Sequence, residues 1–175
     1  MRFALLPLGV SFLITQVLAD GASILTAMTT ITNATLALNT TLNSFPSNPE
    51  LAIGDIAPLL VDSVNLLDDI NNGVTVATQS ANLTLPETIE VAQATLNLST
   101  AVSTTLSNLM RTKANFDKLK VITPVVLVNL KLENAASERF GAAVVAKVPP
   151  AFQAQALSLL APIEASFNTT IAYYS

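Results

Sequence analysis

Residues 24–45, ILTAMTTITNATLALNTTLNSF, repeat their apolar positions in steps of three and four. This spacing is typical of an amphipathic helix, so we predict a helix over residues 21–44. The opposite face carries Thr, Ser and Asn, and no charged residue occurs between Gly21 and Pro49. Thr35 fills the one gap in the apolar row, which consists of Ile24, Met28, Ile31, Leu38, Leu42 and Phe45.

The rest of the chain has helical periodicity and no convincing strand. The prolines of FPSNPE (45–50) end the first helix, and we expect a second helix over about 51–80. Thr84, Pro86 and Glu87 form a capping-box sequence, so a third helix should begin here and run to about residue 120. VITP (121–124) interrupts the third helix, a fourth helix should follow over about 124–147, and VPP (148–150) ends it. In the fifth helix Pro162 lies on the outer side and should bend the helix.

Each of these helices offers a row of residues for a common core. The second contributes Ile53, Ile56, Leu60, Val64, Leu67 and Ile70; the third contributes Leu85, Ile89, Ala92, Leu96, Leu106 and Leu109. The fourth contributes Leu127, Leu130, Ala135 and Val144; the fifth contributes Ala156, Leu160, Ile163, Phe167, Ile171 and Tyr174. We therefore predict an all-α fold, a single antiparallel bundle of about five amphipathic helices that has room for a central apolar cavity.

The N-terminal segment MRFALLPLGVSFLITQVLA has the features of a secretory signal peptide. A basic second residue precedes an apolar run that is too short for a membrane span of about 20 residues. We expect cleavage after Ala19, so that residues 1–19 are removed and residues 20–175 form one secreted domain. No later apolar run is long enough to cross a bilayer, and the final IAYYS does not resemble a lipid-anchor signal.

Five N-glycosylation sequons follow the signal peptide. On a helical wheel Asn33 falls opposite the apolar row, whereas Asn39 falls at its edge and is the weaker candidate. The alternative is that Thr and Asn simply keep the surface soluble without charge. The acceptor residues would be Asn33, Asn39, Asn82, Asn97 and Asn168.

Charge is distributed unevenly along the chain. From residue 20 to Arg111 there are eight acids and no base, and from Arg111 onward there are seven bases and four acids. One interpretation is that the later basic helices lie beside the earlier acidic ones as exposed pairs, each worth about 0–1 kcal/mol. The other is that the segment from Arg111 to Lys120 lines the mouth of an apolar site and receives a carboxylate.

The sequence lacks the residues of common catalytic sites. With no His and no Cys, it cannot form a Ser-His-Asp or Cys-His arrangement or a typical zinc site. Asp68 and Asp69 diverge on a helix, and we expect Glu133 and Glu138 to be ordinary exposed helix acids. We therefore predict that the protein is not an enzyme and needs no metal or cofactor.

Hydrophobic residues make up 51% of the sequence and charged residues only 11%. The net negative charge and the lack of a basic stripe with aromatic residues argue against nucleic-acid binding. A secreted bundle with surplus apolar surface can enclose an apolar ligand between its helices or present that surface to an interface.

Several features together resemble the fungal hydrophobic surface-binding protein A family, which includes cell-wall galactomannoproteins with lipid-binding domains. They are the signal peptide, the Cys-free chain, the Thr-rich first helix, AVVAKVP (143–149) preceded by Phe140, and the final Phe167, Ile171 and Tyr174. The resemblance covers nearly the whole of residues 20–175 and implies a five-helix bundle whose apolar tunnel holds a long-chain fatty acid. It also implies adsorption to hydrophobic surfaces, recruitment of hydrolases in some members, and a secreted or cell-wall location.

Two hypotheses follow from these observations, a lipid carrier and a surface-active wall mannoprotein. In the first, the carboxylate of a fatty acid, or the polar end of a similar lipid, contacts Arg111, Lys113 or a hydroxyl near the mouth. In the second, one helix turns its apolar row toward a hydrophobic surface, and docking on a secreted hydrolase is a third alternative. The expected cavity residues of the first hypothesis are Met28, Ile31, Leu60, Leu67, Leu96, Leu127, Leu130, Leu160 and Phe167.

Overall fold

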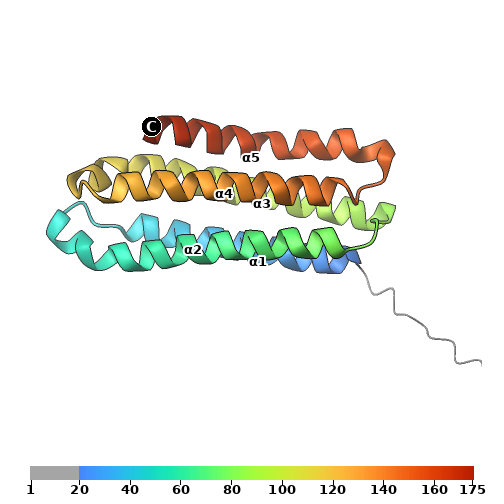
Figure 1. The fold of residues 1–175 in the computed structure, drawn as a ribbon, viewed down its shortest axis with the longest axis horizontal. Helices are drawn as coiled ribbons and strands as arrows, with labels where there is room; N and C mark the ends of the chain where they lie inside the picture. The colour runs from blue at the N-terminus through green and yellow to red at the C-terminus, as the bar shows by residue number, and fades with distance from the viewer. Residues whose placement is uncertain (1–19) are drawn as a thin grey trace, which may run out of the picture.

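Five long helices form the fold, and consecutive helices run in opposite directions (Figure 1). The structure is a computed structural model that describes residues 20–175, without the side chains of Asp20 and residues 49–53. The predicted signal peptide, residues 1–19, lies outside the described residues. The predicted all-α bundle is confirmed. Its elements are α1 (Asp20–Ser44), α2 (Pro49–Gln79), α3 (Leu85–Lys118), α4 (Ile122–Val145), the 3₁₀ turn η1 (Pro150–Phe152) and α5 (Gln153–Tyr174).

The helices are stacked in three levels. α1 and α2 form the first, α3 and α4 form the second, and α5 lies on α3 and α4 (Figure 1). α1 packs on α2 and α3, and α2 packs on α4, but α3 and α4 make few contacts with each other. Because α3 and α4 are held apart, the space between them is available for a cavity under α5.

The start of α3 is fixed by the capping box that the sequence predicts. Thr84 Oγ1 accepts from the backbone N–H of Glu87, and Glu87 Oε2 accepts from the backbone N–H of Thr84 at 2.8 Å. These bonds satisfy two backbone donors that the first helical turn would leave unpaired. Pro58 and Pro162 both lie inside continuous helices.

The predicted core rows hold for α1 and α5 and only in part for α2 and α3, where Ile70, Leu106 and Leu109 are buried as predicted. Val64 was expected inside α2 but is 52% exposed, and Leu85, Ile89 and Leu96 of α3 are also exposed. In α4, Leu127 is only partly buried. The buried rows contain the predicted Ile70, Leu106, Leu109, Leu130 and Val144. The residues that the prediction missed are Leu59, Ser63 and Leu66 in α2, Thr88, Val91, Thr95, Leu98, Val102 and Thr105 in α3, and Val126, Glu133 and Phe140 in α4.

Threonine explains the rotated row of α3. The buried Thr95 and Thr105 each donate their hydroxyl to the backbone carbonyl four residues earlier, both at 2.8 Å. A hydroxyl that is hydrogen-bonded within its own helix can be buried without the cost of an unpaired polar group. A Thr-rich helix can therefore turn its hydroxyl residues inward and leave leucines outside.

Candidate ligand-binding cavity

A cavity of about 400 Å³ lies under α5 between α3 and α4. All five helices contribute to its walls, which are predominantly hydrophobic. The volume lies within the range of about 300–1,000 Å³ that is typical of small-molecule sites. Its inner wall includes Met28, Ile31, Leu66, Ile70, Leu98, Val102, Phe140, Val144, Ile163 and Phe167.

Two glycines allow helices to approach closely beside the cavity. A Cβ on Gly141 of α4 would lie 2.8 Å from Leu160 Cδ1 of α5, and one on Gly73 of α2 would lie 3.0 Å from Ile31 Cδ1. Both distances are shorter than ordinary contacts between carbon atoms. The absent side chains therefore let α4 and α5 meet along one edge of the cavity, while its middle stays open.

The rim of the cavity is apolar and partly open to water. Leu85 and Ile89 of α3, Phe152 of η1 and Leu157 of α5 line the cavity and are also exposed. Exposed hydrophobic side chains at a cavity edge are typical of a binding groove. The rim thus gives an apolar molecule a route between bulk solvent and the interior.

Glu133 of α4 is the exception in the apolar wall. The prediction that it is an exposed acid is wrong, because it is only 4% exposed and lines the cavity. Ser63 Oγ of α2 donates to its Oε1 at 2.7 Å, and Asn129 Nδ2 donates to Ser63 Oγ at 3.1 Å. Burial raises the pKa of Glu133 to about 7, because desolvation outweighs the hydrogen bond from Ser63.

A sequence signal for Glu133 existed. It lies three residues after Leu130 and seven before Phe140, on the row that faces the core, and Ser63 similarly continues the row of Leu59 and Leu66. An acid and a hydroxyl at inward positions of two neighbouring helices point to a buried polar contact. Glu138, in contrast, is exposed as expected.

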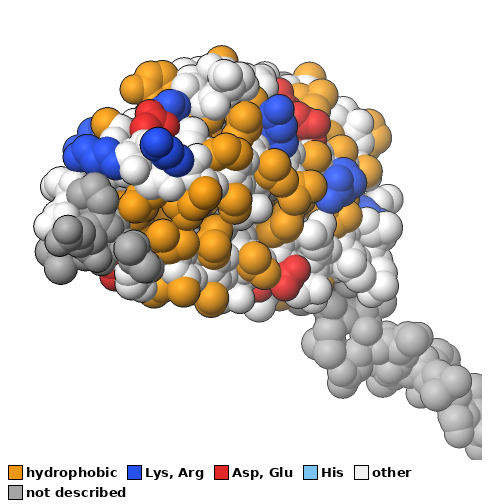
Figure 2. Space-filling model, turned by 60° about the vertical axis from the view of Figure 1, so that its left-hand side comes forward, with side chains coloured by type: hydrophobic (Ala, Val, Ile, Leu, Met, Phe, Trp, Pro, Cys, Tyr) orange, Lys and Arg blue, Asp and Glu red, His pale blue; other side chains and the backbone are white. Residues whose placement is uncertain are grey.

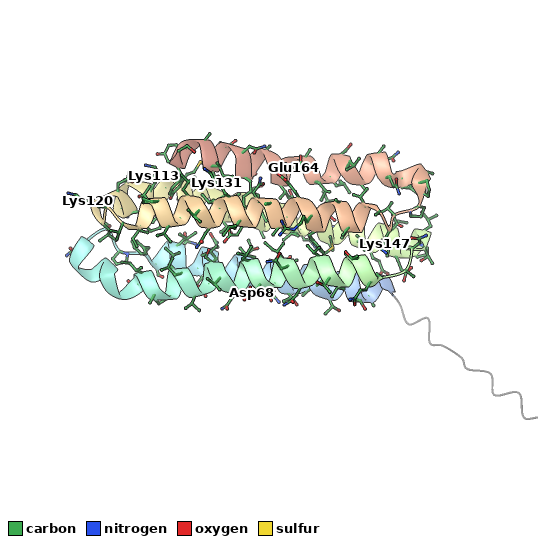
Figure 3. The ribbon with its side chains drawn as sticks, in the orientation of Figure 1. Asp68, Lys113, Lys120, Lys131, Lys147 and Glu164 are labelled. Carbon is green, nitrogen blue, oxygen red and sulfur yellow. The ribbon has the colours of Figure 1, made fainter. Side chains whose placement is uncertain are left out.

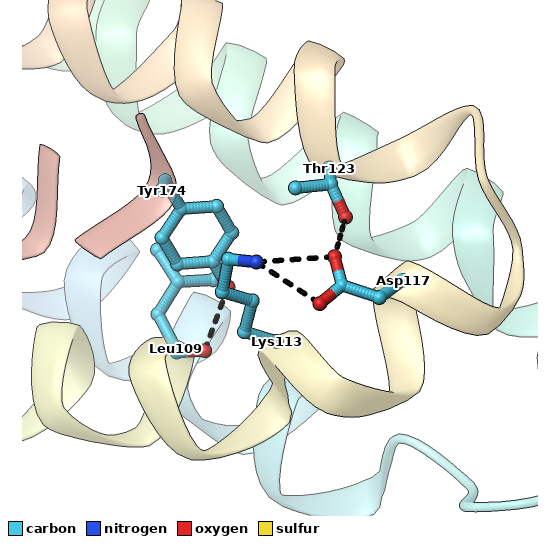
Figure 4. A network of polar contacts seen from close by, with 5 residues as sticks. All are labelled: Leu109, Lys113, Asp117, Thr123 and Tyr174. Carbon is cyan, nitrogen blue, oxygen red and sulfur yellow. Dashed lines mark hydrogen bonds and ion pairs between the residues drawn. The ribbon is translucent and has the colours of Figure 1, made fainter. Parts of the chain in front are cut away.

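The predicted carboxylate contacts, Arg111 and Lys113, lie outside the cavity wall toward the end of α3, where Figure 3 labels Lys113. Arg111 is exposed and donates to Asn108, and neither it nor Lys113 is part of the cavity wall. Lys113 forms an ion pair with Asp117 at 2.9 Å, and Asp117 also accepts from Thr123 Oγ1 at 2.7 Å (Figure 4). These bonds connect the end of α3 to the start of α4.

The same ion pair bears on the expectation that basic residues of the later helices pair with acids of the earlier ones. Lys113 and Asp117 are both in α3, and theirs is the one ion pair among the described residues. The basic residues of the later helices therefore do not form ion pairs with the described acids of α2, Asp55, Asp62, Asp68 and Asp69. All ionisable residues in the described cavity wall are acids, namely Glu133, Glu138 and Glu164.

Four of the nine predicted apolar site residues line the cavity: Met28, Ile31, Leu160 and Phe167. Leu96 is 46% exposed and lies outside the wall. The structure also places Leu60, Leu67, Leu127 and Leu130 outside it. Their predicted contact with a ligand is not tested by the structure.

The five sequons lie in different surroundings. Asn33, Asn82, Asn97 and Asn168 are exposed, whereas Asn39 is half-buried and accepts a 2.5 Å hydrogen bond from Asn108 Nδ2. Within residues 20–175, no helix is long and apolar enough to span a bilayer, and no cluster of acids could hold a metal ion.

Comparisons with known proteins identify a family and several solved structures that the chain resembles. The profile of the family described as hydrophobic surface binding protein A matches residues 21–146 and ends before α5. No curated protein matches the chain. Three similar solved structures carry ligands; their TM-scores of 0.80–0.82 show a shared fold, at a sequence identity of only 17–21%.

The first of these structures is AfMp4p in complex with palmitic acid, with a TM-score of 0.82, 21% identity, and coverage of 89% of this chain and 100% of that one. The second is ligand binding domain 1 of the Penicillium marneffei MP1 protein complexed with arachidonic acids (TM-score 0.81, 17% identity, coverage 89% and 99%). Ligand binding domain 2 of the same protein, complexed with multiple arachidonic acids, has a TM-score of 0.80 (19% identity, coverage 88% and 95%).

Proposed function

The chain belongs to the hydrophobic surface binding protein A family, and we propose that it is a secreted, non-enzymatic protein that encloses a long-chain fatty acid or similar lipid between its helices. The cavity under α5 is the observation that carries this proposal. Its walls are apolar, its rim is open, and proteins of the same fold have been solved with palmitic and arachidonic acids. An apolar chain placed there would be removed from water, which is the main source of affinity for such ligands.

Native mass spectrometry of the secreted protein after enzymatic deglycosylation is the first test, followed by organic extraction of any co-purifying compound. A mass step of one ligand that extracts as a fatty acid or related lipid supports the proposal. A protein that is empty and also fails to take up added fatty acids contradicts it.

A pair of matched substitutions tests whether the ligand occupies this cavity. Ala156 of α5 lines the cavity, so Ala156→Phe should fill part of it and weaken binding of hexadecanoic acid by about tenfold or more. Leu96→Phe adds an aromatic ring outside the wall and should leave binding unchanged. Equal affinity of both variants would place the ligand elsewhere.

Adsorption to hydrophobic surfaces is a second candidate function, and exposed side chains favour it. One face of the bundle shows a broad area of hydrophobic side chains with scattered charges (Figure 2). Val121, directly before α4, and Val125, Val128 and Leu132 within it follow one another in steps of three and four, and all are exposed. Such a stripe offers an apolar area that needs no opening of the bundle.

The second candidate predicts binding to hydrophobic beads that an excess of fatty acid does not displace. Replacing Val125 and Val128 by Ser should weaken adsorption and leave the uptake of fatty acid intact, because neither residue lines the cavity. If filling the cavity with a lipid abolishes adsorption, the two activities share one site. A cell-wall location and recruitment of a hydrolase would be consequences of this second function.

A further inference from the structure

The cavity contains one buried ionisable group, the carboxyl of Glu133. Its Oε1 accepts from Ser63, while no hydrogen bond from the described residues reaches Oε2. Among the described residues, no fully buried side-chain N or O atom lacks a hydrogen-bond partner, so the unbonded Oε2 must keep some accessible surface. Since Glu133 lines the cavity, we take this surface to face the cavity. A buried carboxyl that presents a free oxygen to an apolar site is a specific hydrogen-bonding position for a ligand.

The surroundings of Glu133 hold no positive group that would pair with an anion. α1 has no charged residue after Asp20, α3 has none between Glu90 and Arg111, and α5 has only Glu164. α2 contributes Asp62 and Asp69, which lie outside the cavity wall, and the exposed Lys131, Glu138 and Arg139 of α4 complete the set. Arg139 donates to Asn71 of α2, and Lys131 does not line the cavity.

We propose that Glu133 is the head-group contact of this cavity and that its carboxyl shares one proton with the carboxyl of a bound fatty acid. This inference deepens the proposed function and depends on it. Two adjacent carboxylates in an apolar site cannot both be ionised, so one proton must remain between them. Ser63 holds Oε1, which directs Oε2 toward the ligand.

The proposal makes fatty-acid binding depend on pH in a defined direction. Burial raises the pKa of Glu133 to about 7 in the empty protein. Below this pH, Glu133 already carries the shared proton, whereas above it the proton must be taken from water. The affinity for the acid should therefore fall about tenfold for each pH unit above about 7. A fatty alcohol brings its own O–H donor and should be much less sensitive to pH.

The chain is well suited to this test because it has no His and no Cys. No other ordinary side chain titrates between about pH 5 and 8. The delipidated secreted protein is titrated with hexadecanoic acid and with hexadecan-1-ol at about pH 6, 7 and 8.5. We expect the acid to lose more than tenfold in affinity across this range and the alcohol to change by less than about threefold.

Glu133→Gln should remove the pH dependence of fatty-acid binding and raise the affinity at high pH. Gln can still accept from Ser63 with its oxygen, while its amide donates to the ligand's carboxylate at every pH. The variant should bind the acid with little pH dependence and more tightly than wild type at about pH 8.5. Glu90→Gln makes the same change at an exposed site outside the cavity and should retain the wild-type profile.

Proton uptake provides a second measurement that needs no variant. At about pH 8, binding of the acid to wild type should take up close to one proton. This uptake appears as a difference in calorimetric heat between buffers with different ionisation enthalpies. The inference is overturned if binding takes up no proton, or if wild type and Glu133→Gln have the same pH profile. Failure of both ligands to bind at any pH would instead overturn the proposed function.

Discussion

Tyr174 of α5 donates a 2.8 Å hydrogen bond to the backbone carbonyl of Leu109 in α3 (Figure 4). A second bond between these helices joins Ser103 and Ser166 at 3.0 Å. Among the described residues, no side-chain hydrogen bond joins α5 to α4, where Gly141 and Leu160 meet by packing alone. α5 is therefore anchored along α3, and we expect it to separate from α4 first when the cavity opens.

The hydrogen bond between Tyr174 and Leu109 should stabilise the packing of α5 on α3, over the cavity. Tyr174→Phe removes the hydroxyl from a buried position and should cost about 1 kcal/mol of unfolding free energy. Hydrogen exchange should become faster in α5 and stay unchanged in α1 and α2. Tyr173, which is 56% exposed against 4% for Tyr174, supplies the control Tyr173→Phe, which should have no effect. Equal exchange in both variants would contradict the anchoring role.

Glu133 should make the empty protein less stable as pH rises. Its pKa of about 7 in the folded state exceeds the ordinary value of 4.5, so between these values the folded state binds more protons than the unfolded state. The contribution of Glu133 to the free energy of unfolding is then fully present below about pH 4.5. It is lost as pH rises through about 7, which lowers the free energy of unfolding by at most about 3 kcal/mol. Urea denaturation of wild type, Glu133→Gln and Glu90→Gln at several pH values measures this. Only Glu133→Gln should lose the decline, and a wild-type curve parallel to it would refute the prediction.

The capping box should contribute to the stability of α3. Thr84→Ala removes the side-chain oxygen that accepts from the N–H of Glu87 and should cost about 1 kcal/mol. Thr84 also completes the sequon of Asn82, so the comparison requires protein produced without glycosylation. Thr84→Ser retains the hydroxyl and should behave like wild type in urea denaturation. A variant with Ala that unfolds at the wild-type midpoint would show that the cap is dispensable.

The hydrogen bond of Asn39 predicts which sequons carry sugar. A glycan on Asn39 would disturb a half-buried amide that accepts from Asn108, whereas the exposed Asn33, Asn82, Asn97 and Asn168 have room for one. Peptide mapping by mass spectrometry of the secreted protein should find glycans only among these four. Full occupancy of Asn39 would mean that the contact between α1 and α3 differs in the mature protein.

The sequence by itself determined the helices and their order, chiefly through the periodicity of its apolar residues. Proline-containing breaks and the capping box placed the ends of the helices within a few residues, and the core rows of α1 and α5 followed from Leu, Ile, Met and Phe at steps of three and four. The apolar surplus pointed to an enclosed ligand or an exposed surface. These features are local or compositional, so they can be determined without knowledge of the neighbouring helices.

The tertiary structure decided which face of α2, α3 and α4 is buried and where the cavity lies. Thr95 faces inward because its hydroxyl bonds to its own helix, which lets the more apolar Leu96 face outward. Glu133 is buried because Ser63, seventy positions earlier in the sequence, donates to it, and Lys113 forms an ion pair with Asp117. Such partners are fixed only when the helices pack, because a buried polar side chain is stable only where a complementary group reaches it.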